Sequence, residues 1–256
     1  MRIVRRRAMI AGGVLLLAAM AMAQPLRERI SDMAARGMDA IQTMASPARA
    51  QADITLPERT VYALQLGAYD NGKHAQDELV RLCDAGTLCV IWQREQMRLV
   101  CDAALSKGKL SSTAAQGRDA WAIQDTLPEV VLRAQGHAGA MDAVRDLLTL
   151  PDTLFAALSS QEEELAALVA SAREAAKKAQ NAHPENALYT QLAQSLVNWC
   201  NLMDSTVSSH GEAVARSYAR VTMCTLCYEL RQALIAESTA SAQRTPSTAA
   251  DVMPPA

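Results

Sequence analysis

"VYALQLGAYDNGKHAQDELVRLCDAG", residues 61–86, carries the clearest structural signal in the chain. In its first nine positions, every second residue belongs to one set rich in large apolar side chains, and the residues between them include Gln65 and Gly67. This alternation is typical of a strand with one buried face. One face then holds Tyr62, Leu64, Leu66 and Ala68, and the other holds Val61, Ala63, Gln65, Gly67 and Tyr69. We therefore predict a half-buried strand in which Gln65 and Tyr69 share the face opposite to the two leucines.

The second half of this stretch predicts a helix. Asp70 and Asn71 are residue types that cap helix N-termini, and Gly86 is suited to a left-handed stop at the other end. The apolar positions between them follow the i, i+4, i+7, i+8 spacing of one helix face. They are Ala75, Leu79, Leu82 and Cys83.

Two further strands are expected at residues 88–92 and 97–102, with the polar segment "QREQ" as the hairpin between them. Residues 106–116 supply a weakly patterned second helix. Strand-like character returns in "DAWAIQ", residues 119–124, and in "EVVLRA", residues 129–134.

The order strand, helix, strand, strand, helix, strand predicts an α+β fold. Residues 60–135 would form a small ferredoxin-like or RNP-like antiparallel sheet domain. Because both helices would lie on one face, the other face is expected to be open.

Residues 61–69 followed by "DNGKHAQDEL" resemble the first strand and helix of a SPOR domain, the sporulation-related repeat module of bacterial cell-wall proteins. The resemblance lies in Gln65, Gly67, Ala68, Tyr69 and the helical Ala75. It implies an RNP-like sheet that binds peptidoglycan glycan strands at sites of cell division or sporulation, without catalysis. It covers residues 60–135, and the third-strand segment "MRLVCDAAL" lacks the family's glycine and aromatic residue.

A ligand face also follows from the residues themselves. If Cys89 pairs with Cys101 and Ile91 with Leu99, then Trp92 falls on the opposite face of the hairpin. Val90, Arg98 and Val100 share that face. The predicted ligand-binding residues are Gln65, Tyr69, Trp92 and Arg98, because sugar rings stack on aromatic faces and an amide both donates to and accepts from hydroxyls. The alternative is that this face packs on the C-terminal helices and binds no glycan.

The N-terminus has the layout of an export signal. Arginines at positions 2, 5, 6 and 7 precede the uncharged run 8–23, and Ala21-Met22-Ala23 fits a signal-peptidase site. Residues 1–23 are therefore predicted to be a signal anchor, which places a single-pass protein in the cell membrane with its C-terminal part outside the cytoplasm. The alternative is a signal peptide, with secretion after cleavage near Ala23. Residues 24–59 are expected to be a linker with a weak helix.

The C-terminal half predicts a helical bundle over residues 138–237. A short helix at 140–150 would precede a second that starts at Pro151 and runs to about residue 180. Two more would follow, the last over residues 212–237. The bundle is either a spacer or a docking surface for an envelope protein, and the tail 238–256 is expected to be disordered.

The remaining features argue against catalysis and against nucleic acid. The formal net charge of −2 gives no general attraction to phosphates. No nucleotide-binding or hydrolase motif is recognisable, so we predict no enzyme, no cofactor and no metal. Six cysteines in an exported chain invite disulfides, with Cys89–Cys101 and Cys200 with Cys224 or Cys227 as candidates. The predicted function is a non-catalytic peptidoglycan-binding protein of the bacterial cell envelope, and the alternative is an envelope structural or interaction protein.

Overall fold

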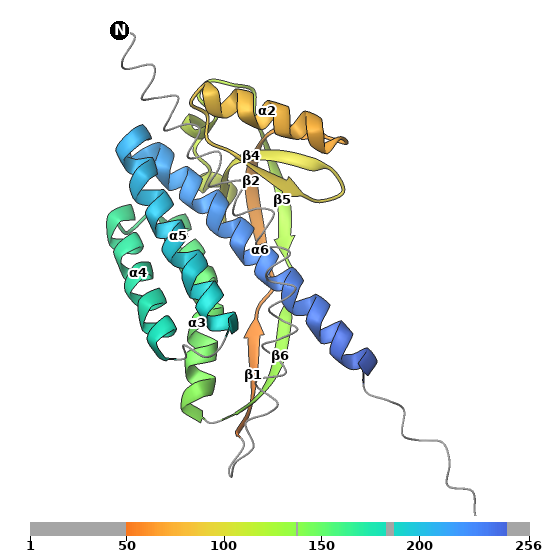
Figure 1. The fold of residues 1–256 in the computed structure, drawn as a ribbon. Coiled ribbons are helices and arrows are strands. Elements are labelled where there is room, and N and C mark those ends of the chain that lie inside the picture. Colours follow the sequence, from red (N-terminus) through yellow and green to blue (C-terminus); the bar gives the residue numbers. More distant parts are fainter. Residues whose placement is uncertain (1–49, 137, 183–186, 245–256) are drawn as a thin grey trace, which may run out of the picture.

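A computed structural model describes residues 50–136, 138–182 and 187–244 of the chain. It is an α+β structure of antiparallel strands followed by helices, which confirms the predicted fold class (Figure 1). The predicted signal segment 1–23, residues 24–49 of the linker and residues 245–256 of the tail lie outside the described residues.

The opening motif forms strand β2 (Arg59–Tyr69) and helix α2 (Gly72–Asp84), as predicted. Asn71 is the N-cap of α2, and its side chain accepts a hydrogen bond of 2.8 Å from the backbone N–H of Lys73. Gly86 has φ of +84°, so the expected left-handed stop is present. The buried face of α2 contains three of the four expected residues, Ala75, Leu79 and Leu82, and the fourth, Cys83, is half-buried.

The main sheet has four antiparallel strands in the order β3-β4-β2-β5. Strands β3 (Val90–Gln93) and β4 (Met97–Ala104) form the predicted hairpin, and Ile91 pairs with Leu99 as expected. Strand β5 (Trp121–Leu127) pairs with the other side of β2. The weak helix expected at 106–116 is replaced by two short 3-10 helices, η1 (Lys107–Lys109) and η2 (Ser112–Ala115).

A two-stranded ribbon continues this sheet at one end. Strand β1 (Ala50–Leu56) pairs with β6 (Val130–Gly136), so the last part of the predicted linker is a strand. Pro57 separates β1 from β2, and Pro128 separates β5 from β6. Since proline has no N–H to donate to a ladder, the two prolines interrupt pairing at the same level and divide one long pair of strands into two.

Four helices follow the strands in the described part of the chain. They are α3 (Ala138–Ser160), α4 (Leu165–Ala182), α5 (Ala187–His210) and α6 (Glu212–Arg244). The predicted limits of the last helix were too short, because α6 extends seven residues into the expected tail. Gly211 has φ of +80° and makes the tight turn between α5 and α6.

The predicted helix boundary at Pro151 is wrong. Helix α3 runs through Pro151, and the chain leaves the helix at Gln161, which has φ of +63°. Proline in a helix interior removes one hydrogen bond, but Pro151 is buried and the neighbouring Asp152 is bound by Arg231. The tertiary packing of this turn therefore outweighs the local preference for a break.

The two faces of the main sheet support two different cores. On the α2 face, Leu64, Leu99 and Cys101 pack with Leu79 and Leu82 of α2. The opposite face, here called the α6 face, contributes Val61, Ala63, Trp92 and Val100 to the large core shared with the C-terminal helices. Figure 1 shows α6 crossing this face of the strands diagonally.

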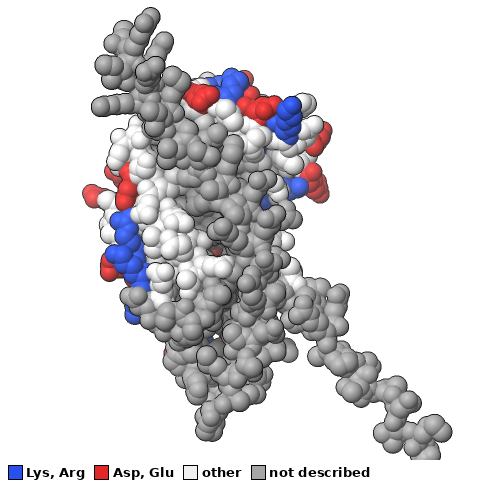
Figure 2. Space-filling view, in the orientation of Figure 1, with Lys and Arg blue, Asp and Glu red and all other residues white. Residues whose placement is uncertain are grey.

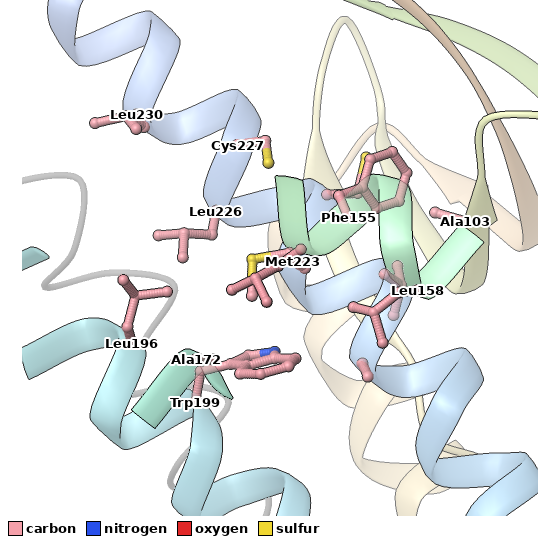
Figure 3. Close-up of a cluster of buried hydrophobic side chains, with 14 of the residues drawn as sticks. Ala103, Phe155, Leu158, Ala172, Leu196, Trp199, Met223, Leu226, Cys227 and Leu230 are labelled. Atoms are coloured by element: carbon pink, nitrogen blue, oxygen red, sulfur yellow. The ribbon is translucent and has the colours of Figure 1, made fainter. Parts of the chain in front are cut away.

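The shared core shows how closely the helices and sheet are joined. In Figure 3, Met223 and Leu226 of α6 lie toward Leu196 and Trp199 of α5, while Phe155 of α3 lies near Ala103 of β4. The prediction that this face of the sheet is open is therefore wrong. The apolar stripes of α3 and α6 need a partner surface, and the sheet supplies it.

Candidate functional site

Trp92, predicted to bind ligand, lies under α6. Only 1% of its surface is exposed, and its indole Nε1–H donates a hydrogen bond of 2.9 Å to the hydroxyl of Thr225 in α6. Arg98 pairs directly with Trp92 across the hairpin and is half-buried. The predicted common face of these two residues is confirmed, but its ring face is covered by the helix rather than open to a ligand.

Tyr69 lies on the other side of the sheet from Trp92. Its neighbour across the ladder is Met97, and its ring packs on the core of the α2 face. The cause is an irregular pairing of β2 with β4, in which register shifts occur on both sides of Gln65. Such a bulge adds a residue on one strand, and the side chains after it lie on the opposite face of the sheet from the one that simple alternation predicts. The prediction that Gln65 and Tyr69 share a face is therefore wrong.

Gly67 fits this arrangement because the ring of Tyr69 lies against its backbone. A Cβ atom built on Gly67 would be 2.8 Å from the hydroxyl oxygen of Tyr69. The motif that suggested a SPOR strand therefore has a local packing role: the glycine leaves room for the tyrosine two residues later. Burial, followed by the nearby carboxylate of Glu78, raises the pKa of Tyr69.

Gln65 is half-buried on the inner strand β2, at the last position that pairs with β5. It pairs with Val100 on one side and with Trp121 of β5 on the other. Trp121 is 57% exposed, the largest exposed fraction among the large apolar side chains of the described residues. The structure thus places one predicted site residue, Gln65, beside an exposed aromatic ring that sequence reasoning did not select.

Arg94 joins the hairpin, strand β5 and helix α6. Its Nε donates a hydrogen bond of 2.7 Å to Asp125 of β5, and its guanidinium lies 3.4 Å from the ring centroid of Tyr228 in α6. The same group lies 5.1 Å from the ring centroid of Trp92. These contacts combine a half-buried ion pair with cation–π attraction, and they close α6 onto this end of the sheet.

A buried ion pair joins α6 to strand β4. Arg220 is 1% exposed and donates hydrogen bonds of 2.9 and 2.6 Å to the two carboxylate oxygens of Asp102. The backbone N–H groups of Ala103 and Ser111 also donate to this carboxylate. Burial raises the pKa of Asp102 to about 6, while Arg220 opposes the rise, so the carboxylate is ionised at neutral pH.

A second buried pair lies where the two prolines interrupt the strands. Arg231 of α6 donates hydrogen bonds of 2.7 and 2.5 Å to the carboxylate of Asp152 in α3. Its remaining N–H groups donate to the carbonyl oxygens of Pro57 and Pro128, at 3.1 and 2.8 Å. One guanidinium therefore satisfies the backbone groups left without ladder partners by the break.

Sequence reasoning missed these two arginines, although a signal for them was present. Arg220 and Arg231 stand eleven residues apart, about three helical turns, in the mostly apolar segment "RVTMCTLCYELR", in which Glu229 is the only other charged residue. Both therefore lie on one side of the helix among residues that must be buried. A buried arginine needs a carboxylate or carbonyl partner, so this pattern predicts fixed ion pairs beneath the helix.

The six cysteines are all free thiols. Cys224 and Cys227 are buried within α6, and burial is the main cause that raises the pKa of both thiols. Within the described ranges, no group of three or more histidine, cysteine or acidic residues is arranged to hold a metal ion. No helix in these ranges is both long and apolar enough to cross a membrane.

Charged side chains of both signs lie on the face drawn in Figure 2. Figure 2 shows acidic and basic residues mixed over the top of the molecule and along the side formed by the outer helices. On the described part of this face there is no broad patch of one sign, so the view gives no sign of a polyanion-binding surface.

Comparisons of the chain with protein-family models, with curated proteins and with solved structures give no match. The SPOR resemblance of residues 60–135 therefore stays a prediction.

Proposed function

We propose that this chain is a non-catalytic structural and interaction protein of the bacterial cell envelope, in which a SPOR-like sheet serves as the packing platform for C-terminal helices. The observation that carries this proposal is the burial of Trp92 beneath α6, with its indole bonded to Thr225. Because Trp92 is buried, this face of the sheet packs against the helices, and the indole ring is not accessible to a sugar.

The strand order supports assigning the sheet to the ferredoxin-like or RNP-like class. In that fold the first strand lies between the third and the fourth, and the second lies at the edge. The order β3-β4-β2-β5 has this arrangement, with α2 in the position of the first helix. The short helices η1 and η2 take the place of the second.

The envelope location rests on residues 1–23. The arginines followed by the uncharged run 8–23 support a single-pass anchor that holds the rest of the chain outside the cytoplasm. Cleavage near Ala23 would instead release the same globular part. In either case an envelope protein partner would contact the C-terminal helices.

A second candidate function, binding of peptidoglycan glycan strands, is favoured by one observation. Trp121 is 57% exposed and lies directly opposite Gln65 on neighbouring strands. An exposed ring beside an amide suits a sugar, because the ring stacks on C–H faces and the amide bonds to hydroxyls. This pair would replace the platform of Gln65, Tyr69, Trp92 and Arg98.

Sedimentation with purified sacculi distinguishes the two functions. Protein lacking residues 1–23 is mixed with amidase-treated sacculi and centrifuged, and we expect it to remain in the supernatant. If it sediments, Trp121→Ala is compared with Val131→Ala, which removes an apolar side chain of similar exposure, 50%, on β6. Loss of sedimentation with Trp121→Ala alone establishes the second function, and sedimentation of both variants contradicts the first proposal and the assignment of binding to Trp121.

A further inference from the structure

Three of the six cysteines gather in the small core between α2 and the sheet. Cys89 and Cys101 are buried there, and Cys83 is half-buried against them at the end of α2. Cys83 and Cys89 are separated by only five residues, which form the turn from α2 into β3. Neither thiol has a role in the ion pairs or in the packing of α6.

The turn that brings Cys83 and Cys89 together is held from both ends. Gly86 N–H donates to the carbonyl of Cys83, and Thr87 N–H donates to the carbonyl of Leu82, both at 2.9 Å. This is a Schellman ending, which reverses the chain directly after the helix. The side chain of Gln116 donates a hydrogen bond of 2.7 Å to the carbonyl of Gly86. The side chain of Arg118 donates one of 3.2 Å to the hydroxyl of the buried Thr87.

The two thiols belong to the same small core, and Cys83 is the more exposed of the two. Interaction with the Cys89 thiol is the main cause that lowers the pKa of Cys83, whereas interaction with Cys83 together with burial raises the pKa of Cys89. A more exposed thiol beside a buried one is the arrangement of an attacking thiol and a resolving thiol.

We propose that Cys83 and Cys89 form an oxidisable dithiol whose disulfide staples the end of α2 to the start of β3. The oxidant is a disulfide compound, either a small-molecule disulfide or an exchange enzyme that carries one. Export, as predicted from residues 1–23, would place the dithiol in a compartment where such oxidants are present.

The reaction balances as two successive thiol–disulfide exchanges. The Cys83 thiolate attacks one sulfur of the oxidant, which forms a mixed disulfide and releases the first thiol of the oxidant. Cys89 then loses its proton and attacks the sulfur of Cys83, and the second thiol of the oxidant leaves with that proton. The protein loses two hydrogens and two electrons, and one disulfide is reduced to two thiols.

Cys101 is the competing partner for Cys89, and its surroundings disfavour it. Its thiol donates a hydrogen bond of 3.5 Å to the carbonyl of Leu64 within the sheet. Burial, with the charge of Asp102 beside it, raises the pKa of Cys101 to about 12. A thiol that is protonated and engaged in this way is a poor nucleophile, so exchange is directed to Cys83.

Peptide mapping after oxidation tests the proposal. The native full chain, held in detergent, is incubated with oxidised glutathione, quenched in acid, denatured, alkylated and digested with trypsin. Cleavage after Arg81 and Arg94 places Cys83 and Cys89 on one peptide, 82–94, while Cys101 falls on another that begins at Leu99. We expect peptide 82–94 to lose both alkyl labels and to be lighter by two hydrogens.

Two variants make the result specific. Cys101→Ser should still form the bond within peptide 82–94, and Cys89→Ser should stop at a glutathione adduct on Cys83. A peptide 82–94 from the native wild-type chain that carries two alkyl labels overturns the proposal. So does a crosslink between Cys89 and Cys101, or an adduct on Cys83 that persists in the wild-type chain. None of these outcomes depends on whether the protein binds sacculi.

Discussion

Arg231 shows how one side chain can hold together segments that are distant in the sequence. Its partners belong to α3 and to the two proline breaks, and 99% of its side-chain surface is removed from solvent. An arginine in such a place is stable only because every N–H group has an acceptor and its charge has a counterion. Removing it would leave Asp152 and two prolyl carbonyl groups without their donor.

We therefore expect Arg231→Met to lower the free energy of unfolding by about 3 kcal/mol, because it leaves the buried carboxylate of Asp152 with only the more exposed Arg59, at 3.8 Å, as a counterion. Urea denaturation followed by circular dichroism measures this loss. The matched control is Arg173→Met, which breaks an exposed ion pair with Asp204 and should cost at most about 1 kcal/mol.

The double variant Arg231→Met, Asp152→Leu provides a further check. It removes the buried carboxylate that has lost its main partner and should regain part of the lost stability, while the carbonyls of Pro57 and Pro128 remain without a donor. Equal stability of Arg231→Met and Arg173→Met would contradict the assigned role.

The turn between α2 and β3 is the element whose local sequence and structure agree most closely. Asn71 caps α2, the apolar positions face the sheet, and Gly86 ends the helix with a left-handed residue. Strand β2 is different: its alternation holds as far as Gln65, and the bulge then reverses the direction of the side chains. The pattern of one strand does not reveal such a bulge, because it depends on how the neighbouring strand pairs.

Gly86→Ala tests the turn. A Cβ atom at this position would meet no close neighbour, since the nearest atom is Gln116 Oε1 at 3.8 Å, so only the positive φ is costly. We expect a loss of about 1–2 kcal/mol in the free energy of unfolding, the cost of a left-handed backbone for an L-residue. Thermal unfolding at fixed pH gives the value.

Gly108→Ala is the matched substitution, because Gly108 shares the open surroundings of Gly86 without its positive φ. It should change stability by less than about 0.5 kcal/mol. If the two variants unfold alike, the left-handed residue at position 86 contributes nothing to the turn.

The molecule as a whole has one large core that includes both strands and helices. Val61 and Trp92 of the sheet belong to the same buried cluster as Leu158, Leu196 and Leu226 of the helices. Arg94, Arg220 and Arg231 then fix α6, the hairpin and the proline breaks to one another. Because the sheet and the helices share this core, neither can unfold without exposing apolar side chains of the other to water.

We accordingly expect the sheet and the helices to unfold together. Native-state hydrogen exchange, read by mass spectrometry, should give the slowest amides of β2, β4, α5 and α6 the same free energy of opening, equal to that of global unfolding. Amides of η1 and of the exposed segment 161–164 should open more easily and serve as an internal comparison. Much lower protection in the sheet than in the helices would contradict a single cooperative unit.

The sequence by itself determined the local elements of this protein: the first strand, the capped helix with its stop at Gly86, the hairpin, and the helical C-terminal half. Capping, alternation and helical periodicity are short-range properties, so they can be recognised from neighbouring residues. Tertiary structure alone decided the bulge after Gln65, the continuous helix through Pro151 and the cover that α6 places over Trp92. These depend on contacts between segments separated by 35 residues (Gln65 and Val100), 79 residues (Asp152 and Arg231) and 133 residues (Trp92 and Thr225). Burial of apolar area and pairing of buried charges across such separations outweigh local preference.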